Sequence, residues 1–204
     1  MLPQSTCQRL APCEPASAGT RCLLSLAWCQ SLAGRLRQHA EISAPLPPDH
    51  VAVQCTYFEK SIERNWLVPV HQDLSIPVAH RVPKAGLNGW SEKEGMLFVQ
   101  PPIEVLESLV AVRLHLDACT EADGPLVVIP GTHKLGLIDD EAAVQARRGG
   151  PVVTCAVQRG DALVLRPLLL HASSKASGIS MRRVLHFLFG PRELPLGLQW
   201  RLAV

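Results

Sequence analysis

The stretch VAVQCTYFEK, residues 51–60, alternates in the way that is typical of a β-strand. Side chains two apart on a strand share a face, so one face is predicted to carry Gln54, Thr56, Phe58 and Lys60. Similar short runs follow between turn signals: WLVPVHQDL (66–74), LESLVAVRLHLDA (106–118), GPLVVIPGTHKLG (124–136), PVVTCAVQRGDALVLRP (151–167) and MRRVLHFLFG (181–190). Crossover helices between successive strands are missing, which predicts a mostly β, antiparallel fold closed as a jelly roll.

Length and composition fit one globular domain over residues 1–204. The chain has 204 residues, 47% hydrophobic and 19% charged, enough to bury a core without metal or disulfide staples. Residues 1–20 are rich in Pro, Ser and Ala and are predicted to form a loose arm. Leucine spacing predicts a helical preface over 21–48, and the jelly-roll core is expected over 50–200.

Two other segments stand out from the strand pattern. DDEAAVQARR (139–148) is predicted to be helical. Residues 75–102 are punctuated by Gly and Pro and predict a long structureless insert between early strands. Such inserts are often functional, and a lid over a site is one interpretation, a mobile surface loop another.

Composition also excludes several classes of partner. The net charge is +2 with no basic stripe, so no nucleic-acid partner is expected. Seven cysteines are an odd number without CxxC spacing, which argues against a disulfide framework and a thiolate zinc site. CLLSLAWC (22–29) is too short for a signal peptide or a bilayer span, so no membrane partner and a cytoplasmic location are expected. The sequence carries no signal for the oligomeric state.

The most informative polar residues are His71 and Asp73, which share a face of the run 66–74. They are interpreted either as a hydrogen-bonded pair on a wet face or as ligands that hold something. His171 ends an apolar run in RPLLLHASS (166–174). Together the three match the two-histidine, one-carboxylate triad that binds Fe(II) and leaves coordination positions open for a chelating cosubstrate and O2.

Arg182 stands eleven residues after His171 and opens the last strand. A buried arginine requires an anion and binds a carboxylate with its planar fork. Iron with an arginine one strand away suits a dicarboxylate such as 2-oxoglutarate, although a surface charge is the other interpretation. Arg183 is predicted to point to the opposite face.

NWLVPVHQDL, GPLVVIPGTHKLG, GDALVLRPLLLHASS and RRVLHFLFG together resemble the phytanoyl-CoA dioxygenase family of Fe(II)/2-oxoglutarate oxygenases, its small bacterial members above all. The resemblance runs from about residue 50 to 200 and implies a cupin-like double-stranded β-helix. It implies His71, Asp73 and His171 as iron ligands, which are the catalytic centre. The same resemblance assigns cosubstrate binding to four residues: Arg182, Ser173, Lys60 and Arg113.

The chain departs from the family pattern at three places. Val70 stands where relatives often have Trp, Ala118 where many have a second Asp, and the segment before the strands is short. The short segment leaves the substrate pocket undefined.

The implied activity is hydroxylation of a small molecule with Fe(II), 2-oxoglutarate and O2, releasing succinate and CO2. Asp73 occupies the position that a small residue would open to halide, which favours hydroxylation over halogenation. Without a basic cradle for CoA, a small polar metabolite, an amino acid or a natural-product intermediate is the expected substrate. A non-oxygenase cupin-like metal protein and a catalytically silent binding module remain the alternatives.

Overall fold

The computed structural model of the chain describes residues 19–178 and 181–204. Most of the predicted loose arm therefore lies outside the described residues, as do Cys7 and Cys13. The cysteines of the described residues are free: Cys22, Cys29, Cys55, Cys119 and Cys155. Within the described ranges no helix has both the length and the apolar character to span a bilayer.

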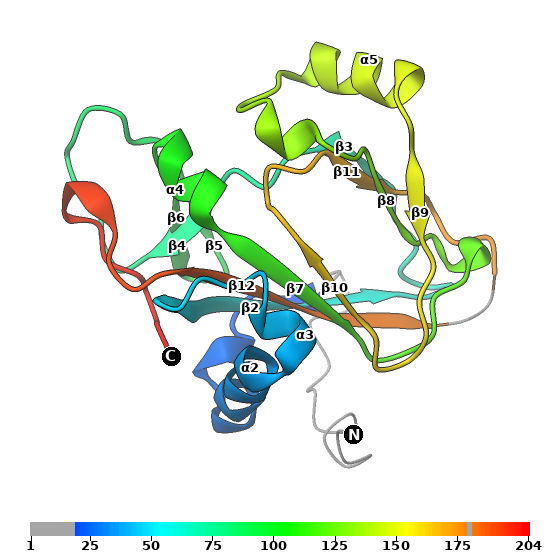
Figure 1. The fold of residues 1–204 in the computed structure, drawn as a ribbon, viewed down its shortest axis with the longest axis horizontal. Coiled ribbons are helices and arrows are strands. Elements are labelled where there is room, and N and C mark those ends of the chain that lie inside the picture. The colour runs from blue at the N-terminus through cyan, green and yellow to red at the C-terminus, as the bar shows by residue number, and fades with distance from the viewer. Residues whose placement is uncertain (1–18, 179–180) are drawn as a thin grey trace.

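Two antiparallel sheets face each other and form the jelly roll (Figure 1). The larger sheet has the order β1-β2-β12-β7-β10, formed by Gly19–Thr20, His50–Lys60, Arg182–Pro191, Val110–His115 and Ala162–Leu165. The smaller has the order β3-β11-β8-β9, formed by Val68–His71, His171–Ser173, Leu126–Val128 and Val153–Cys155. The expectation of a mostly β, cupin-like jelly roll, the double-stranded β-helix that the resemblance implies, is confirmed.

The register of the larger sheet places polar side chains of three strands on its inner face. Arg182 of β12 pairs with Lys60 of β2, and His186 pairs with Thr56 on one side and Arg113 of β7 on the other. Because side chains alternate along a strand, these residues face the smaller sheet. The predicted polar face of residues 51–60 is therefore the face that lines the space between the sheets.

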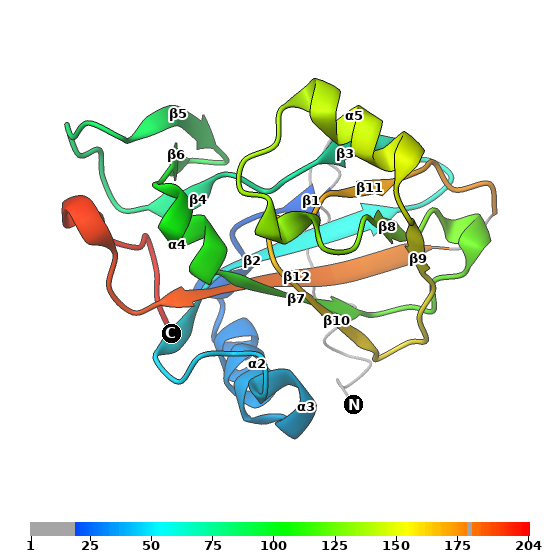
Figure 2. The ribbon, with the colours of Figure 1, turned by 45° about the horizontal axis from the view of Figure 1, so that its top comes forward.

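The outer face of the larger sheet is apolar and is covered by the helical preface. The preface consists of η1 (Leu23–Ser25), α2 (Ala27–Gln38) and α3 (Ala40–Ser43). Its leucines pack on the outward side chains of β2, β7 and β12, among which Phe187 is fully buried. The predicted helix 139–148 is α5 (Asp140–Gly149), which lies over the smaller sheet (Figure 2).

Residues 75–102 are not a structureless insert, which corrects the expectation. They form a third sheet, in the order β4-β6-β5, from Ile76–Val78, Met96–Gln100 and Asn88–Lys93. Lys93 pairs with Met96, so a two-residue turn joins β5 to β6, with φ of 53° at Glu94 and 69° at Gly95. Positive φ at both central residues matches the twist of a tight hairpin.

A second correction concerns residues 106–118, which do not form one strand. The chain is helical first, in α4 (Ile103–Ser108), and β7 starts only at Val110. Pro102 caps this helix, and Val105, Leu106 and Leu109 are buried at helical spacing. Short 3-10 turns complete the fold: η2 (Glu121–Asp123), η3 (Thr132–Lys134) and η4 (Pro195–Gly197).

The packing on the outer face predicts the effect of one core substitution. Phe187→Ala is expected to lower the free energy of unfolding by about 3–5 kcal/mol, because it leaves a cavity between β12 and the helices. Urea denaturation followed by circular dichroism measures this. Leu137→Ala is the control, since Leu137 is 61% exposed, and should change stability by less than about 0.5 kcal/mol. A loss below about 1 kcal/mol for Phe187→Ala would contradict this account.

Candidate metal centre

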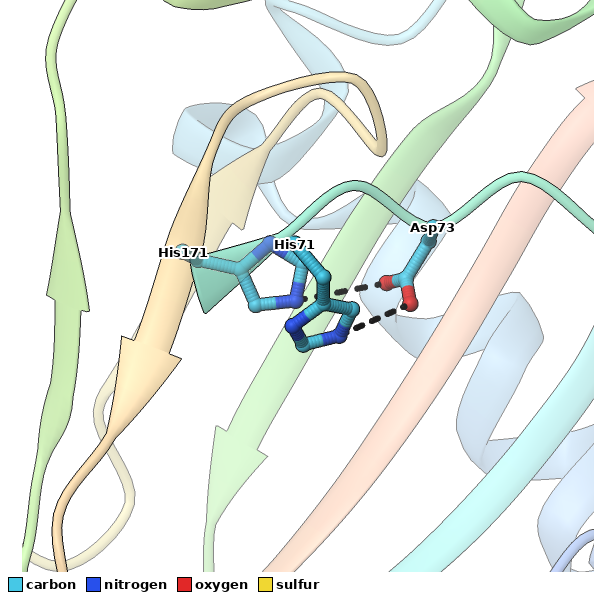
Figure 3. Close-up of side chains that lie close together, drawn as sticks. All are labelled: His71, Asp73 and His171. Carbon is cyan, nitrogen blue, oxygen red and sulfur yellow. Dashed lines mark ion pairs between the residues drawn. The ribbon is translucent and has the colours of Figure 1, made fainter. Parts of the chain in front are cut away.

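Two histidines and one carboxylate meet at one end of the smaller sheet. His71 ends β3, His171 begins β11, and the two residues are paired directly across these antiparallel strands. Their ring centroids lie 4.2 Å apart, and both rings point toward the carboxylate of Asp73 (Figure 3). The structure therefore brings together the three residues that the sequence singled out.

The distances among these groups are those of a small ligand set. His71 Nε2 lies 3.7 Å from Asp73 Oδ1, and His171 Nε2 lies 3.7 Å from Asp73 Oδ2. One ligand atom from each residue lies within 4.8 Å of the other two. In the part of the chain that the structure describes, this is the one group of three such residues.

Asp73 is not on the strand, contrary to the sequence prediction. β3 ends at His71, and Asp73 lies in the loop that follows, where its backbone N–H donates to the carbonyl of Pro167. Proline lacks the N–H that a strand ladder needs, so the 166–170 segment can meet this loop only through its carbonyl there. The carboxylate reaches the histidines through the loop instead of through strand alternation.

Gln72 fixes this loop between the two ligands. Its side chain is buried; Nε2 donates to the carbonyls of Gly136 and Leu168, and Oε1 accepts from the N–H of Ile138. These contacts give Gln72 a structural role in the loop. The amide group links three segments that are remote in sequence.

Backbone carbonyls determine the tautomer of each histidine. His71 Nδ1 lies 2.8 Å from the carbonyl oxygen of Pro69, and His171 Nδ1 lies 2.8 Å from that of Leu169. A carbonyl oxygen only accepts, so each Nδ1 carries the proton. In its neutral form each ring therefore presents an unprotonated Nε2 toward Asp73, which is the form that binds a metal ion.

Charge coupling within the group favours an ionised carboxylate. Burial opposes ionisation of Asp73, but His171 and His71 outweigh it and hold the pKa of Asp73 well below its usual range. The neighbouring Asp73 carboxylate raises the pKa of His71. Burial lowers the pKa of His171 despite the same carboxylate. Asp73 is thus an anion at neutral pH, as a metal ligand must be.

The triad faces a cavity of about 490 Å³, whose opposite wall carries cations from the larger sheet. Arg182 donates to the carbonyl of Gly124 and, at 3.4 Å, to Ser173 Oγ. Lys60 donates to the same Ser173 Oγ at 2.8 Å and is 1% exposed. Burial, followed by the Arg182 charge, lowers the pKa of Lys60 to about 8. The predicted residues Arg182, Ser173 and Lys60 therefore form one cluster.

Arg113 lies in the same wall, on β7. Its guanidinium stacks over Phe58, 5.5 Å from the ring centroid, and Nη1 lies 3.4 Å from His186 Nδ1. Burial, reinforced by the Arg113 charge, lowers the pKa of His186 to about 3, so this ring is a neutral acceptor. His186 also lines the cavity. Its position on the Arg182 face was the signal for a site residue.

His115 is a further buried histidine that the sequence did not single out. It is 1% exposed, and neither ring nitrogen has a hydrogen-bond partner among the described residues. Burial, reinforced by Arg113 and Arg182, lowers the pKa of His115 to about 4. The ring is therefore neutral in the folded protein and charges on unfolding at mildly acidic pH.

Comparison with known families agrees with this site. The family model of phytanoyl-CoA dioxygenase (PhyH) matches residues 20–184. The chain belongs to the phytanoyl-CoA dioxygenase family. Comparison with curated protein sequences gives no significant match.

Solved structures show the same fold at low sequence identity. HygX from Streptomyces hygroscopicus, with nickel and 2-oxoglutarate bound, is 16% identical with a TM-score of 0.56, over 92% of this chain and 76% of that one. SnoN, a non-heme alpha ketoglutarate dependent epimerase from nogalamycin biosynthesis, is 15% identical with a TM-score of 0.60, over 88% and 64%. EvdMO1 is 22% identical with a TM-score of 0.54, over 76% of this chain. The chain spans 30% of the length of EvdMO1.

The buried amide of Gln72 predicts a coupled loss of stability and metal affinity. Gln72→Ala leaves two carbonyls and one N–H without partners, so the free energy of unfolding should fall by about 1–3 kcal/mol. Affinity for Co(II) should fall as well, because the loop that carries Asp73 loosens. Urea denaturation and calorimetric titration measure the two effects. Exposed Gln158→Ala is the control, and an unchanged Co(II) affinity in Gln72→Ala would contradict the coupling.

The lowered pKa of His115 predicts a loss of stability in acid. A histidine whose folded pKa lies below its unfolded value of about 6.5 stabilises the fold above that value, and the contribution is lost as pH falls. Between pH 7 and pH 4 the loss for this group should approach about 3 kcal/mol. Denaturation of the metal-free protein across this range should show a smaller drop for His115→Leu, and an unchanged drop for exposed His80→Leu. Equal pH dependence of His115→Leu and the unsubstituted protein would refute the assignment.

Proposed function

We propose that this member of the phytanoyl-CoA dioxygenase family is an Fe(II)- and 2-oxoglutarate-dependent dioxygenase that hydroxylates a small-molecule substrate. The observation that carries the proposal is the contact of each histidine Nδ1 with a backbone carbonyl, together with the position of Asp73 beside both Nε2 atoms. Their Nδ1 protons are held by backbone carbonyls, so both Nε2 atoms face an ionised Asp73. His71, Asp73 and His171 would hold iron by three ligands, and the remaining positions would stay open.

The opposite wall of the cavity supports a dicarboxylate cosubstrate. Arg182 and Lys60 are buried cations that share the hydroxyl of Ser173, and neither forms an ion pair with a carboxylate among the described residues. A carboxylate placed there would accept charge-assisted hydrogen bonds from both. This supports binding of the distal carboxylate of 2-oxoglutarate by Arg182, Ser173 and Lys60. If the chain were a cupin-like metal protein that uses no dicarboxylate cosubstrate, the buried cations Arg182 and Lys60 would have no ligand to bind.

Iron held by His71, Asp73 and His171, with 2-oxoglutarate bound, would supply the oxidation, in which one atom of O2 would enter a substrate C–H bond as hydroxyl and the other would enter succinate, with release of CO2. The protein contributes positioning and exclusion of water. Apolar side chains that line the cavity keep water from the centre: Phe98, Leu74, Leu109, Leu126 and Leu188. Gln54 and Thr56 on the same wall offer hydrogen bonds that would orient a polar substrate.

Hydroxylation, the single-domain organisation over 1–204 and the cytoplasmic location are parts of the proposal. The presence of Asp73 at the ligand position supports hydroxylation over halogenation. The five free cysteines among the described residues support a reducing compartment. A cavity of about 490 Å³ suits the cosubstrate together with a small molecule.

Anaerobic titration with Fe(II) and then 2-oxoglutarate tests the proposal. The unsubstituted protein should develop the weak visible charge-transfer band of an Fe(II)–2-oxo acid chelate. His71→Ala should abolish the band by removing a metal ligand. Arg182→Gln should keep the affinity for Fe(II) but weaken that for 2-oxoglutarate by roughly 10- to 100-fold, because a charged hydrogen-bond donor is lost. Exposed His80→Ala should behave like the unsubstituted protein.

Each alternative gives a different result in this titration. Fe(II) binding without a band would indicate a cupin-like metal protein, and no metal binding would indicate a silent module. Once a substrate is known, the mass of its product distinguishes hydroxylation, which adds one oxygen atom, from an outcome such as epimerisation, which adds none.

A further inference from the structure

We infer that the primary substrate is an anion, and that its acidic group is bound by Lys93 at the mouth of the cavity. Lys93 would thus be a specificity-determining residue, carried by the β5–β6 hairpin and not by the two sheets of the jelly roll. The inference rests on the proposed function, because it concerns the molecule that the iron centre would oxidise. It deepens that function by naming the chemical class of the substrate.

The β5–β6 hairpin supplies one wall of the cavity. Lys93 of β5 and Phe98 and Gln100 of β6 line it. Ser91 pairs with Phe98, and Lys93 follows two residues after Ser91 on the same strand. Because side chains two apart on a strand share a face, Lys93 lies on the face of the hairpin that carries Phe98 into the cavity.

The ammonium group of Lys93 stands at the cavity mouth without a counter-ion. Lys93 Nζ lies 5.2 Å from the centroid of the Phe98 ring, which is 3% exposed and lines the cavity. Over the residues that the structure describes, no carboxylate forms an ion pair with Lys93. The side chain is exposed, so an anion that enters the cavity can reach a cation that no side chain neutralises.

The arginine at the same mouth differs, because its charge is neutralised. Arg21 lines the cavity, and its Nη1 donates to Glu94 Oε1 at 2.8 Å. Glu94 Oε2 accepts from the Arg21 backbone N–H at 2.8 Å and from Thr20 Oγ1 at 2.7 Å. Glu92 points to the opposite face of β5 from Lys93. The Glu94 contacts therefore hold the hairpin turn in place and leave the charge of Lys93 for a ligand.

The register separates Lys93 from the cations proposed to bind the cosubstrate. Lys60 ends β2 and stands six residues after Gln54, which is about 20 Å at the usual rise per residue. Gln54 shares a smaller pocket with Arg21 and Met96, and Met96 pairs with Lys93. Lys93 therefore lies at the other end of the cavity from Lys60, where it would meet the substrate and not the distal carboxylate of 2-oxoglutarate.

The charge of the loaded cavity also favours an anionic substrate. Asp73 is the one acidic residue among the described residues that line the cavity. Fe(II) with this carboxylate and two neutral imidazoles would carry one positive charge, and 2-oxoglutarate would bring two negative charges. The larger sheet contributes three buried cations, Lys60, Arg113 and Arg182, so two positive charges would remain before Lys93 is counted. A cavity of one sign attracts ligands of the opposite charge.

Matched pairs of acids and amides test the inference. Phenylacetate and benzoate are titrated anaerobically, by calorimetry, into protein loaded with Fe(II) and 2-oxoglutarate. Phenylacetamide and benzamide have nearly the same shapes without the charge. The unsubstituted protein should bind each acid roughly 3- to 10-fold more tightly than its amide, and this preference should shrink at high salt. Lys93→Gln should abolish the preference by weakening the acids alone, whereas Lys93→Arg should retain it.

Two controls accompany the titration. Lys84→Gln alters another exposed lysine, in the segment between β4 and β5, and should keep the full preference for acids. The charge-transfer band of the Fe(II)–2-oxo acid chelate is followed throughout. Its persistence shows that the acids do not displace 2-oxoglutarate and that the Lys93 variants keep the folded metal centre.

Two outcomes would overturn the inference. If neither acid binds more tightly than its amide, whether or not the amides bind, the mouth does not select an anion. If the preference persists in Lys93→Gln, the acidic group is bound by another cation. Failure of the proposed function is distinguishable from both, because the chelate band would then be absent before any probe is added.

Discussion

The alternation of side chains along β12 determines how both faces of the larger sheet are used. Outward residues Leu185, Phe187 and Phe189 pack against the helical preface, and inward residues Arg182, His186 and Leu188 line the cavity. β12 is hydrogen-bonded to β2 on one edge and β7 on the other, so a one-residue slip would exchange the two faces. The hydrophobic packing of the outer face therefore holds the cations of the inner face in place.

Those cations make the free cavity electrostatically unfavourable. Lys60, Arg113 and Arg182 face a triad that contributes one carboxylate, and burial lowers the pKa of all three cations. Each shift means that burial disfavours the charged form. A protein selected for stability alone would replace such groups by apolar ones. A bound anion would offset the free-energy cost of burying three cations in one wall. Functional sites often reduce the stability of the fold in this way.

Features set by neighbouring residues could be predicted from local sequence patterns, whereas features set by contacts between distant segments could not. The alternation of 51–60 correctly gave the face that lines the cavity. The meeting of His71 with His171 depends on the pairing of β3 with β11, which are a hundred residues apart. No local pattern shows this pairing, and it was predicted from the match of the three residue types to a metal triad and from the family resemblance. The β5–β6 hairpin was missed because Glu94 is not a usual residue at positive φ. Asp73 was singled out with the two histidines beside which it lies, but it was wrongly placed on a strand, because the end of β3 follows from tertiary contacts of Gln72.

The metal centre combines two rigid members with one that depends on a loop. Each histidine ring is oriented by the carbonyl two residues before it in the chain, and the two histidines are paired directly across β3 and β11. Asp73 instead depends on the backbone bond to Pro167 and on the three contacts of Gln72. Disturbance of the loop would therefore move the carboxylate while the histidines stay in place. Because the carboxylate is the anionic member of the group, the affinity for a cation would change with its position.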